Sequence, residues 1–247
     1  MRKLGFAFFL VFIAISLTNC FQVNLCTEGS GQVTKRNFDI IEFKTIYVGV
    51  PSKVFIIQDS IPQVEIETDD NLLDFIFVRV VDDQLQIESE KGICPRRLNI
   101  RITNPTYKGI QIDGSADIIA LSPISTNKIY IGINGSGDVL IDSIQTNRIS
   151  IAINGSGDIR IGGIAEDFNA EINGSGDINA IKLLSNKVQV ETNGSGDVYV
   201  NCLQELNISI SGSGDVFYLG NPSTSHIEIK GSGRVKRYIF KEKNITY

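Results

Sequence analysis

Hydrophobic and polar residues alternate with a period of two over most of the chain, which is the pattern of β-strands. Between residues 128 and 141, one side of an extended chain carries Ile129, Ile131, Ile133, Val139 and Ile141, together with two glycines. The other side carries Lys128, Tyr130, Asn134, Ser136 and Asp138. The same phasing returns at 149–161 and at 188–200, and Ile and Val are abundant. The pattern therefore predicts an all-β protein.

A six-residue phrase inside this pattern repeats along the chain. It reads INGSGD at 133–138, 153–158 and 172–177, TNGSGD at 192–197 and ISGSGD at 210–215, with degenerate copies IDGSAD at 112–117 and IKGSGR at 229–234. Its first glycine recurs every 18 to 21 residues, whereas helical repeats need about 33 residues or more. We therefore predict a parallel β-helix, a solenoid with about 20 residues per coil.

The glycines of the phrase are expected to form one corner of each coil. A strand that bends around a core needs room on the inside of the bend and freedom in φ, and glycine supplies both. The expected corner glycines are Gly114, Gly135, Gly137, Gly155, Gly157, Gly174, Gly176, Gly194, Gly196, Gly212, Gly214, Gly231 and Gly233.

Stacked coils would place equivalent polar residues in columns on the outer surface. This candidate binding face consists of Asn134, Ser136, Asp138, Asn154, Ser156, Asp158, Asn173, Ser175, Asp177, Asn193, Ser195 and Asp197. Asn side chains can hydrogen-bond along such a stack. Aspartates about 5 Å apart instead repel by roughly 1 kcal/mol per pair in water, so turn N–H groups, Ser hydroxyls, water or cations must offset the repulsion. We expect Arg234 to lie beside Asp215 and to end the acidic column.

The regions on both sides of the repeats also suggest β-structure. Residues 37–108 alternate without repeating and are broken by turn signals such as Pro51, Pro62 and Pro95. We expect this irregular β segment to cover the N-terminal end of the repeat β-helix at 109–240, with 37–240 forming one unit. Residues 21–36 are interpreted as a polar tether, and the tail YIFKEKNITY is expected to close the other end.

The N-terminus predicts export. Arg2 and Lys3 precede the apolar stretch 4–17, which has the length of a signal-peptide core, so residues 1–20 are interpreted as a signal peptide. Leu17-Thr18-Asn19-Cys20 resembles a bacterial lipobox, in which Cys20 would be lipidated and anchor the protein to a membrane; plain signal cleavage is the alternative. Either route predicts a periplasmic, outer-membrane or cell-surface protein.

Composition excludes several kinds of chemistry. A net charge of −5 gives no reason to expect nucleic acid as a partner. The single histidine, His226, excludes histidine clusters, and we predict no catalytic residues, no metal site and no cofactor. Of the remaining cysteines, Cys26 and Cys94 are the favoured disulfide because Cys202 lies within the repeats, and three reduced, inert cysteines remain the alternative.

Three functions fit a polar solenoid. We favour a non-enzymatic binding or scaffold protein whose flat polar face recognises a glycan or an envelope protein. The first alternative is a β-helical glycan-active enzyme of the pectate lyase or polygalacturonase kind, but six near-equivalent aspartates do not provide two carboxylates in different surroundings. The second is a calcium-binding repeat protein, but the aspartate spacing does not match the GGxGxD loops of calcium-binding β-rolls.

The repeated NGSGD, preceded by VEIETDDNLLDFIFVRVVDDQLQIES and LNIRIT, resembles the GIN domain family over residues 38–235. That family is named as the head domain of auto-transporter adhesins. The resemblance implies a right-handed β-helical fold in an exported, often lipidated, envelope protein. It supplies no set of catalytic residues.

Overall fold

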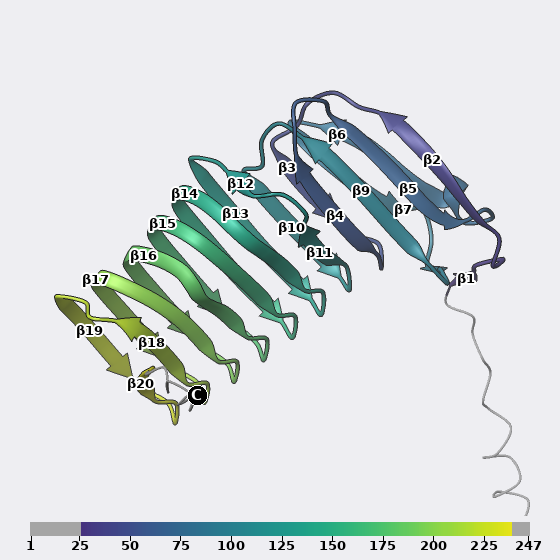
Figure 1. The fold of residues 1–247 in the computed structure, drawn as a ribbon. Coiled ribbons are helices and arrows are strands. Elements are labelled where there is room, and N and C mark those ends of the chain that lie inside the picture. The colour runs from purple at the N-terminus through teal and green to yellow at the C-terminus, as the bar shows by residue number, and fades with distance from the viewer. Residues whose placement is uncertain (1–25, 239–247) are drawn as a thin grey trace, which may run out of the picture.

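The computed structural model describes residues 26–238 and is a parallel β-solenoid of about 6 turns, spaced about 20 residues apart (Figure 1). This confirms the predicted fold class. The strands of the repeat region are β10 (Gly109–Gly114), β11 (Asp117–Ala120), β12 (Ile124–Ser125), β13 (Lys128–Gly135), β14 (Val139–Gly155), β15 (Ile159–Ile172), β16 (Ile178–Thr192), β17 (Val198–Ile210), β18 (Val216–Gly220), β19 (Thr224–Ile229) and β20 (Val235–Arg237).

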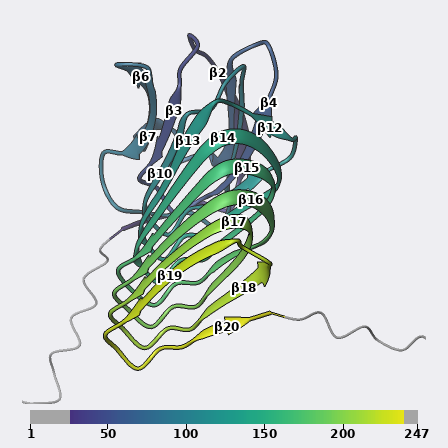
Figure 2. The same cartoon turned by 90° about the vertical axis from the view of Figure 1, so that its left-hand side faces the viewer.

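Equivalent residues of successive coils lie in register. β13 pairs with β14 in parallel, so that Ile133 lies beside Ile153, and Ile153 in turn lies beside Ile172 on β15. All three side chains are fully buried. Burying an isoleucine contributes about 1.5–3 kcal/mol. Each coil therefore depends on its neighbours to cover its apolar side, and Figure 2 shows the coils nested one behind another.

The N-terminal segment extends the solenoid and then covers it. Its elements are β2 (Val33–Asp39), β3 (Thr45–Val48), β4 (Lys53–Gln58), β5 (Gln63–Asp69), the 3₁₀ helix η1 (Leu73–Phe75), β6 (Ile76–Val81), β7 (Gln84–Ser89) and β9 (Leu98–Asn104). β3 and β4 pair in parallel with β10 and β11, so they form a coil beneath the first repeat. β7 and β9 pair in parallel with β3 and β4, and β2, β5 and β6 add antiparallel pairings.

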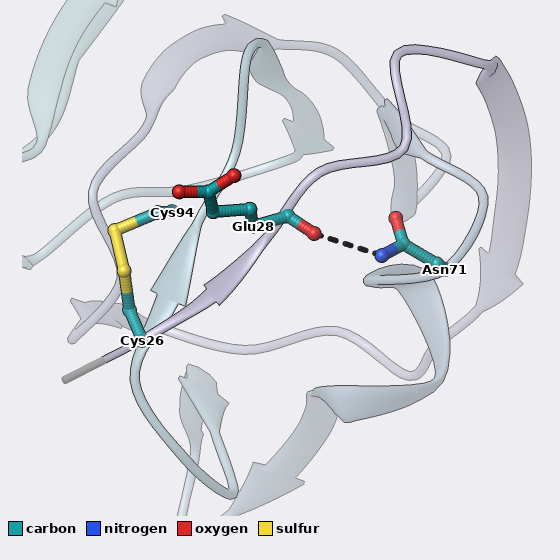
Figure 3. The surroundings of a disulfide bond; sticks show 4 residues. All are labelled: Cys26, Glu28, Asn71 and Cys94. Carbon is teal, nitrogen blue, oxygen red and sulfur yellow. Dashed lines mark hydrogen bonds between the residues drawn. A yellow bond between two sulfur atoms is a disulfide. The ribbon is translucent and has the colours of Figure 1, made fainter. Parts of the chain in front are cut away.

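The predicted tether at 21–36 is wrong for residues 26–36, which belong to the folded body. β1 (Thr27–Glu28) pairs with β8 (Ile93–Cys94), and β2 pairs with β5 over seven residues. Cys26 and Cys94, the pair favoured from the sequence, form a disulfide with a Cα–Cα distance of 5.6 Å (Figure 3). Beside it, Asn71 donates a hydrogen bond to the carbonyl of Glu28 at 2.8 Å. The segment is polar because β2 is an edge strand of the sheet and most of its side chains are exposed.

Several predictions fall outside the described residues. The signal peptide, Cys20 and tail residues 239–247 are among them. Within the described residues, no helix has the length and apolar character needed to cross a membrane.

The last described coil is only partly covered. Ile227 and Ile229 of β19 are 43% and 44% exposed, whereas their neighbours one coil earlier, Ile208 and Ile210, are 2% and 0% exposed. Within residues 26–238, β19 pairs with β17 alone, so its other edge has no strand partner.

Candidate functional site

The NGSGD phrase forms the same corner in every coil, and backbone hydrogen bonds join each corner to the one before it. The Ser156 N–H donates to the carbonyl of Gly135 at 2.8 Å, and the Ser175 N–H donates to that of Gly155 at 2.8 Å. The same bond recurs at each later copy. The corner is therefore a place where two backbones approach closely along the solenoid axis.

This close approach, rather than room on the inside of a bend, explains most of the glycines. A Cβ added to Gly155 would collide with the carbonyl oxygen of Gly135, and one added to Gly157 would collide with that of Gly137. Backbone atoms cannot move aside as a flexible side chain can. Freedom in φ is a minor reason, because among the corner glycines only Gly114 and Gly135 have left-handed φ values, +111° and +148°.

The degenerate first copy follows from the same geometry. Ala116 stands where all six later copies have a glycine, and it is fully buried. The coil beneath it has no glycine pair, because its corner reads Val50-Pro51-Ser52. A Cβ on Gly114 would likewise meet no atom within 4 Å. Crowding by a neighbouring corner therefore begins only where one repeat corner stacks on another, whereas at Gly114 the left-handed φ of +111° is what favours glycine.

The outward side of these corners is the turn face, which we define as the twelve Asn, Ser and Asp residues between Asn134 and Asp197 named above. All twelve are exposed except Asp197, which is half-buried. The second glycine of each pair is buried with the aliphatic residues. The alternation predicted from the sequence therefore runs through the corner.

Each aspartate of the turn face accepts a hydrogen bond from the backbone of the next coil. Oδ1 of Asp138 accepts from the Asp158 N–H at 2.8 Å, and Oδ1 of Asp158 accepts from the Asp177 N–H at 2.8 Å. The series continues to Asp197 and Asp215 at 2.7 Å each. Charge-assisted bonds of this kind offset the repulsion between neighbouring carboxylates. The second oxygen of Asp138, Asp158, Asp177 and Asp197 has no partner among the described residues.

The asparagines form a second ladder beside the acidic one. Nδ2 of Asn154 donates to Oδ1 of Asn134 at 3.0 Å, and the series continues through Asn173 at 3.2 Å and Asn193 at 3.0 Å. The ladder starts at Asp113, which accepts from Asn134 at 2.8 Å and from the Tyr47 hydroxyl at 2.8 Å. The hydrogen bond from Tyr47 to Asp113 raises the pKa of Tyr47 to about 12.

Arg234 ends the acidic column, as predicted. Its Nη2 lies 2.8 Å from Oδ2 of Asp215, and its backbone N–H donates to Oδ1 at 2.9 Å. Lys236 lies 2.9 Å from the same Oδ2, a contact that the sequence analysis missed. The hydrogen bonds from Arg234 and then Lys236 lower the pKa of Asp215 to about 2.

The other end of the column also carries a cation. Lys53 of β4 is the register neighbour of Asp117 on β11. Sequence reasoning missed it because β4 lies 64 residues before Asp117 and does not belong to the repeats. A groove of about 260 Å³ extends from Lys53 along the column past Asp117, Asp138 and Asp158, and its lining also includes Ile119, Leu140 and Arg160. The groove places carboxylates beside apolar side chains.

The aspartates of the turn face lie in similar surroundings. Each of them accepts the backbone N–H of the aspartate one coil later, in the series that runs from Asp138 to Asp197. An acid–base pair instead needs two carboxylates in different surroundings. Among residues 26–238, no three His, Cys, Asp or Glu side chains are grouped so that they could hold a metal ion. Cys202 is fully buried, and burial raises the pKa of its thiol.

Comparison with known proteins gives one family and several related folds. The family model described as "Putative auto-transporter adhesin, head GIN domain" matches residues 42–222. A crystal structure of a putative adhesin from Bacteroides fragilis is 26% identical, covers 86% of this chain and 100% of its own, and has a TM-score of 0.83. No match was found among curated proteins.

Two further crystal structures share the fold. A putative adhesin from Parabacteroides merdae is 22% identical with a TM-score of 0.69, and a putative lipid binding protein from Parabacteroides distasonis is 24% identical with a TM-score of 0.70. Each covers 86% of this chain and 99% of its own.

Proposed function

The chain belongs to the family described as "Putative auto-transporter adhesin, head GIN domain", and we propose that it is a non-enzymatic envelope adhesin that binds a repeating polymer through the turn face. The observation that carries the proposal is the free carboxylate oxygen that each of four successive coils presents at the same position. A ligand with a regular repeat can meet such an array many times, and its weak contacts then add up.

The surroundings of the array suit a polysaccharide. Carboxylate and amide oxygens accept hydrogen bonds from hydroxyl groups, and Ile119 and Leu140 offer apolar surface next to Asp117 and Asp138. Neighbouring coils are about 4.8 Å apart, a spacing of the same order as one sugar unit. The Asn ladder adds a parallel row of amides beside the acids.

The turn face does not show the two unlike carboxylates that the alternative function, a glycan-active enzyme, would need. Asp138, Asp158 and Asp177 each accept one backbone N–H through Oδ1 and are each exposed. General acid–base catalysis of glycoside cleavage needs one carboxyl group that stays protonated and one that stays ionised. The three surroundings are alike and provide no such pair, so the array suits recognition better than cleavage.

The proposed adhesin function also predicts where the protein is located. An adhesin acts outside the cell, and we propose that the lipid expected on Cys20 holds the protein at the outer membrane. Protease shaving of intact cells tests this part: an adhesin loses the described domain to the protease, whereas a periplasmic protein stays protected.

Binding is tested with the full mature chain on immobilised polysaccharides. The variant Asp138→Asn/Asp158→Asn/Asp177→Asn keeps each Oδ1 acceptor and removes the three charges. We expect it to lose binding while its melting temperature stays unchanged. Retention of binding by this variant would contradict the proposal.

A further inference from the structure

A second hollow adjoins the groove beside the acidic column. This cavity of about 870 Å³ lies between the loop that follows the disulfide-bonded Cys94, the start of β4 and the first repeat corner. Its wall includes Lys53, Arg96, Arg97 and Asp117. Because Lys53 and Asp117 also line the groove, the two hollows are continuous. A ligand that follows the turn face towards the N-terminal segment therefore reaches this cavity.

Two cations of the cavity have no counter-ion. Neither the Lys53 ammonium nor the Arg96 guanidinium makes an ion pair or a side-chain hydrogen bond among the described residues. Arg97 lies 3.1 Å from Glu67, which holds it. Asp117 is the only acid in the wall, and it is not ion-paired with Lys53 although the two are register neighbours. The cavity therefore carries an excess of positive charge in a chain whose net charge is −5.

The wall around these cations is rigid. The Arg96 N–H donates to Oδ2 of Asp69 at 2.9 Å, and Asp69 is fully buried. Cys94, two residues before Arg96, is fixed by its disulfide to Cys26 (Figure 3). Lys53 begins β4, which pairs with both β9 and β11. Attaching two cations to a paired strand and to a disulfide-linked loop holds their backbone in place, which lowers the entropy lost when a ligand binds.

From this geometry we infer that the cavity is a subsite for the acidic group of a saccharide, a carboxylate or a sulfate, whose neutral part lies along the turn face. The inference rests on the proposed function, which supplies the polymer, and adds its chemical class. Arg and Lys bind such anions through charge-assisted hydrogen bonds. A flat membrane surface fits less well, because Lys53 and Arg96 line a hollow and not a protruding surface.

The test uses the full mature chain with trigalacturonic acid and with its methyl ester, which is uncharged. We expect the acid to bind about tenfold more tightly than the ester at low salt, with the difference shrinking as salt rises. The variant Lys53→Gln/Arg96→Gln should abolish this difference. The control Lys182→Gln, which removes an exposed cation that lines neither the cavity nor the groove, should keep it.

The inference would be overturned if the wild type bound the acid and the ester equally well, or if Lys53→Gln/Arg96→Gln kept the preference for the acid. It would also be overturned if the protein bound phosphatidylglycerol vesicles through these two residues but did not bind the acid. Unfolding temperatures of all variants exclude a loss of fold as the cause. If the ester binds through the turn face but the acid gains nothing, the proposed function stands and the acidic subsite fails. If the acid binds through Lys53 and Arg96 while turn-face variants bind the ester normally, the proposed function fails instead.

Discussion

Oδ1 of Asp158 accepts the backbone N–H of Asp177 at 2.8 Å, from one coil to the next. The same relationship joins Asp138 to Asp158 and Asp177 to Asp197. A column of like charges is thereby turned into a ladder of charge-assisted hydrogen bonds. One carboxylate oxygen per coil serves the fold, and the other has no partner in the part of the chain that the structure describes.

Removing this acceptor should destabilise the protein, whereas removing only the charge should not. We expect Asp158→Ala to lower the free energy of unfolding by about 1 kcal/mol, because the Asp177 N–H loses its partner. Asp158→Asn keeps Oδ1 and reduces repulsion, so it should change stability by less than about 0.5 kcal/mol. Urea denaturation measures both, and equal losses in the two variants would show that the hydrogen bond is unimportant.

The corner glycines should tolerate no side chain at all. We expect Gly155→Ala to cost about 3 kcal/mol or more, because its Cβ would overlap the carbonyl oxygen of Gly135, which cannot move without shifting a coil. The control Gly49→Ala places its Cβ 3.4 Å from the Tyr47 ring, an ordinary contact, and should cost less than about 1 kcal/mol. Thermal unfolding compares them, and a mild effect at Gly155 would contradict close stacking.

The C-terminal ion cluster should make stability depend on pH in a narrow acid window. The pKa of Asp215 is lowered from 3.8 to about 2 in the folded protein, so its contribution is complete above pH 4 and is lost as pH falls towards 2. Because Arg234 and Lys236 are 69% and 44% exposed, screening limits this contribution to about 1 kcal/mol.

We therefore expect Arg234→Gln/Lys236→Gln to be less stable than the wild type at pH 6, with the difference shrinking as pH falls towards 2. Unfolding free energies measured across this range test the assignment. A difference that stays constant with pH would assign the stabilisation to something other than the Asp215 charge.

One core position departs from the repeat in a way that should lower stability. Thr192 lies between Ile172 and Ile210 in a column of buried residues, is 1% exposed, and its hydroxyl has no hydrogen-bond partner in the described structure. We expect Thr192→Val to raise the free energy of unfolding by about 1 kcal/mol, because it removes an unsatisfied polar group at nearly constant volume. A destabilised variant in urea denaturation would show that the hydroxyl is satisfied in solution.

The repeat region could be predicted from the sequence because its residues repeat in register. The alternation of Ile133, Gly135 and Gly137 with Asn134 and Ser136 defines a buried and an exposed side without knowledge of any distant contact. The cation after Asp215 was visible for the same reason: Arg234 occupies the aspartate position of the next copy.

Contacts between the N-terminal segment and the repeats could not be predicted, because that segment does not share the repeated sequence. The sequence does not show that β4 stacks under β11, so the place of Lys53 in the acidic column and its cavity with Arg96 could not be inferred. The polar composition of residues 26–36 suggested a tether, although β2 lies on the sheet as a surface strand. The glycines were identified correctly, but their reason is a clash with the neighbouring coil, which only the stacked structure reveals.

The most direct test of the account is quantitative binding of the full mature chain to a polysaccharide that it recognises, compared between two triple variants of equal charge. One is Asp138→Asn/Asp158→Asn/Asp177→Asn on the turn face, and the other is Glu90→Gln/Asp142→Asn/Glu166→Gln, which removes three exposed acids that make no hydrogen bond to the turn face. Our account predicts that the first variant loses binding and that the second binds like the wild type, with unchanged unfolding temperatures in both. Equal binding by the two variants would show that the turn face builds the solenoid and recognises nothing.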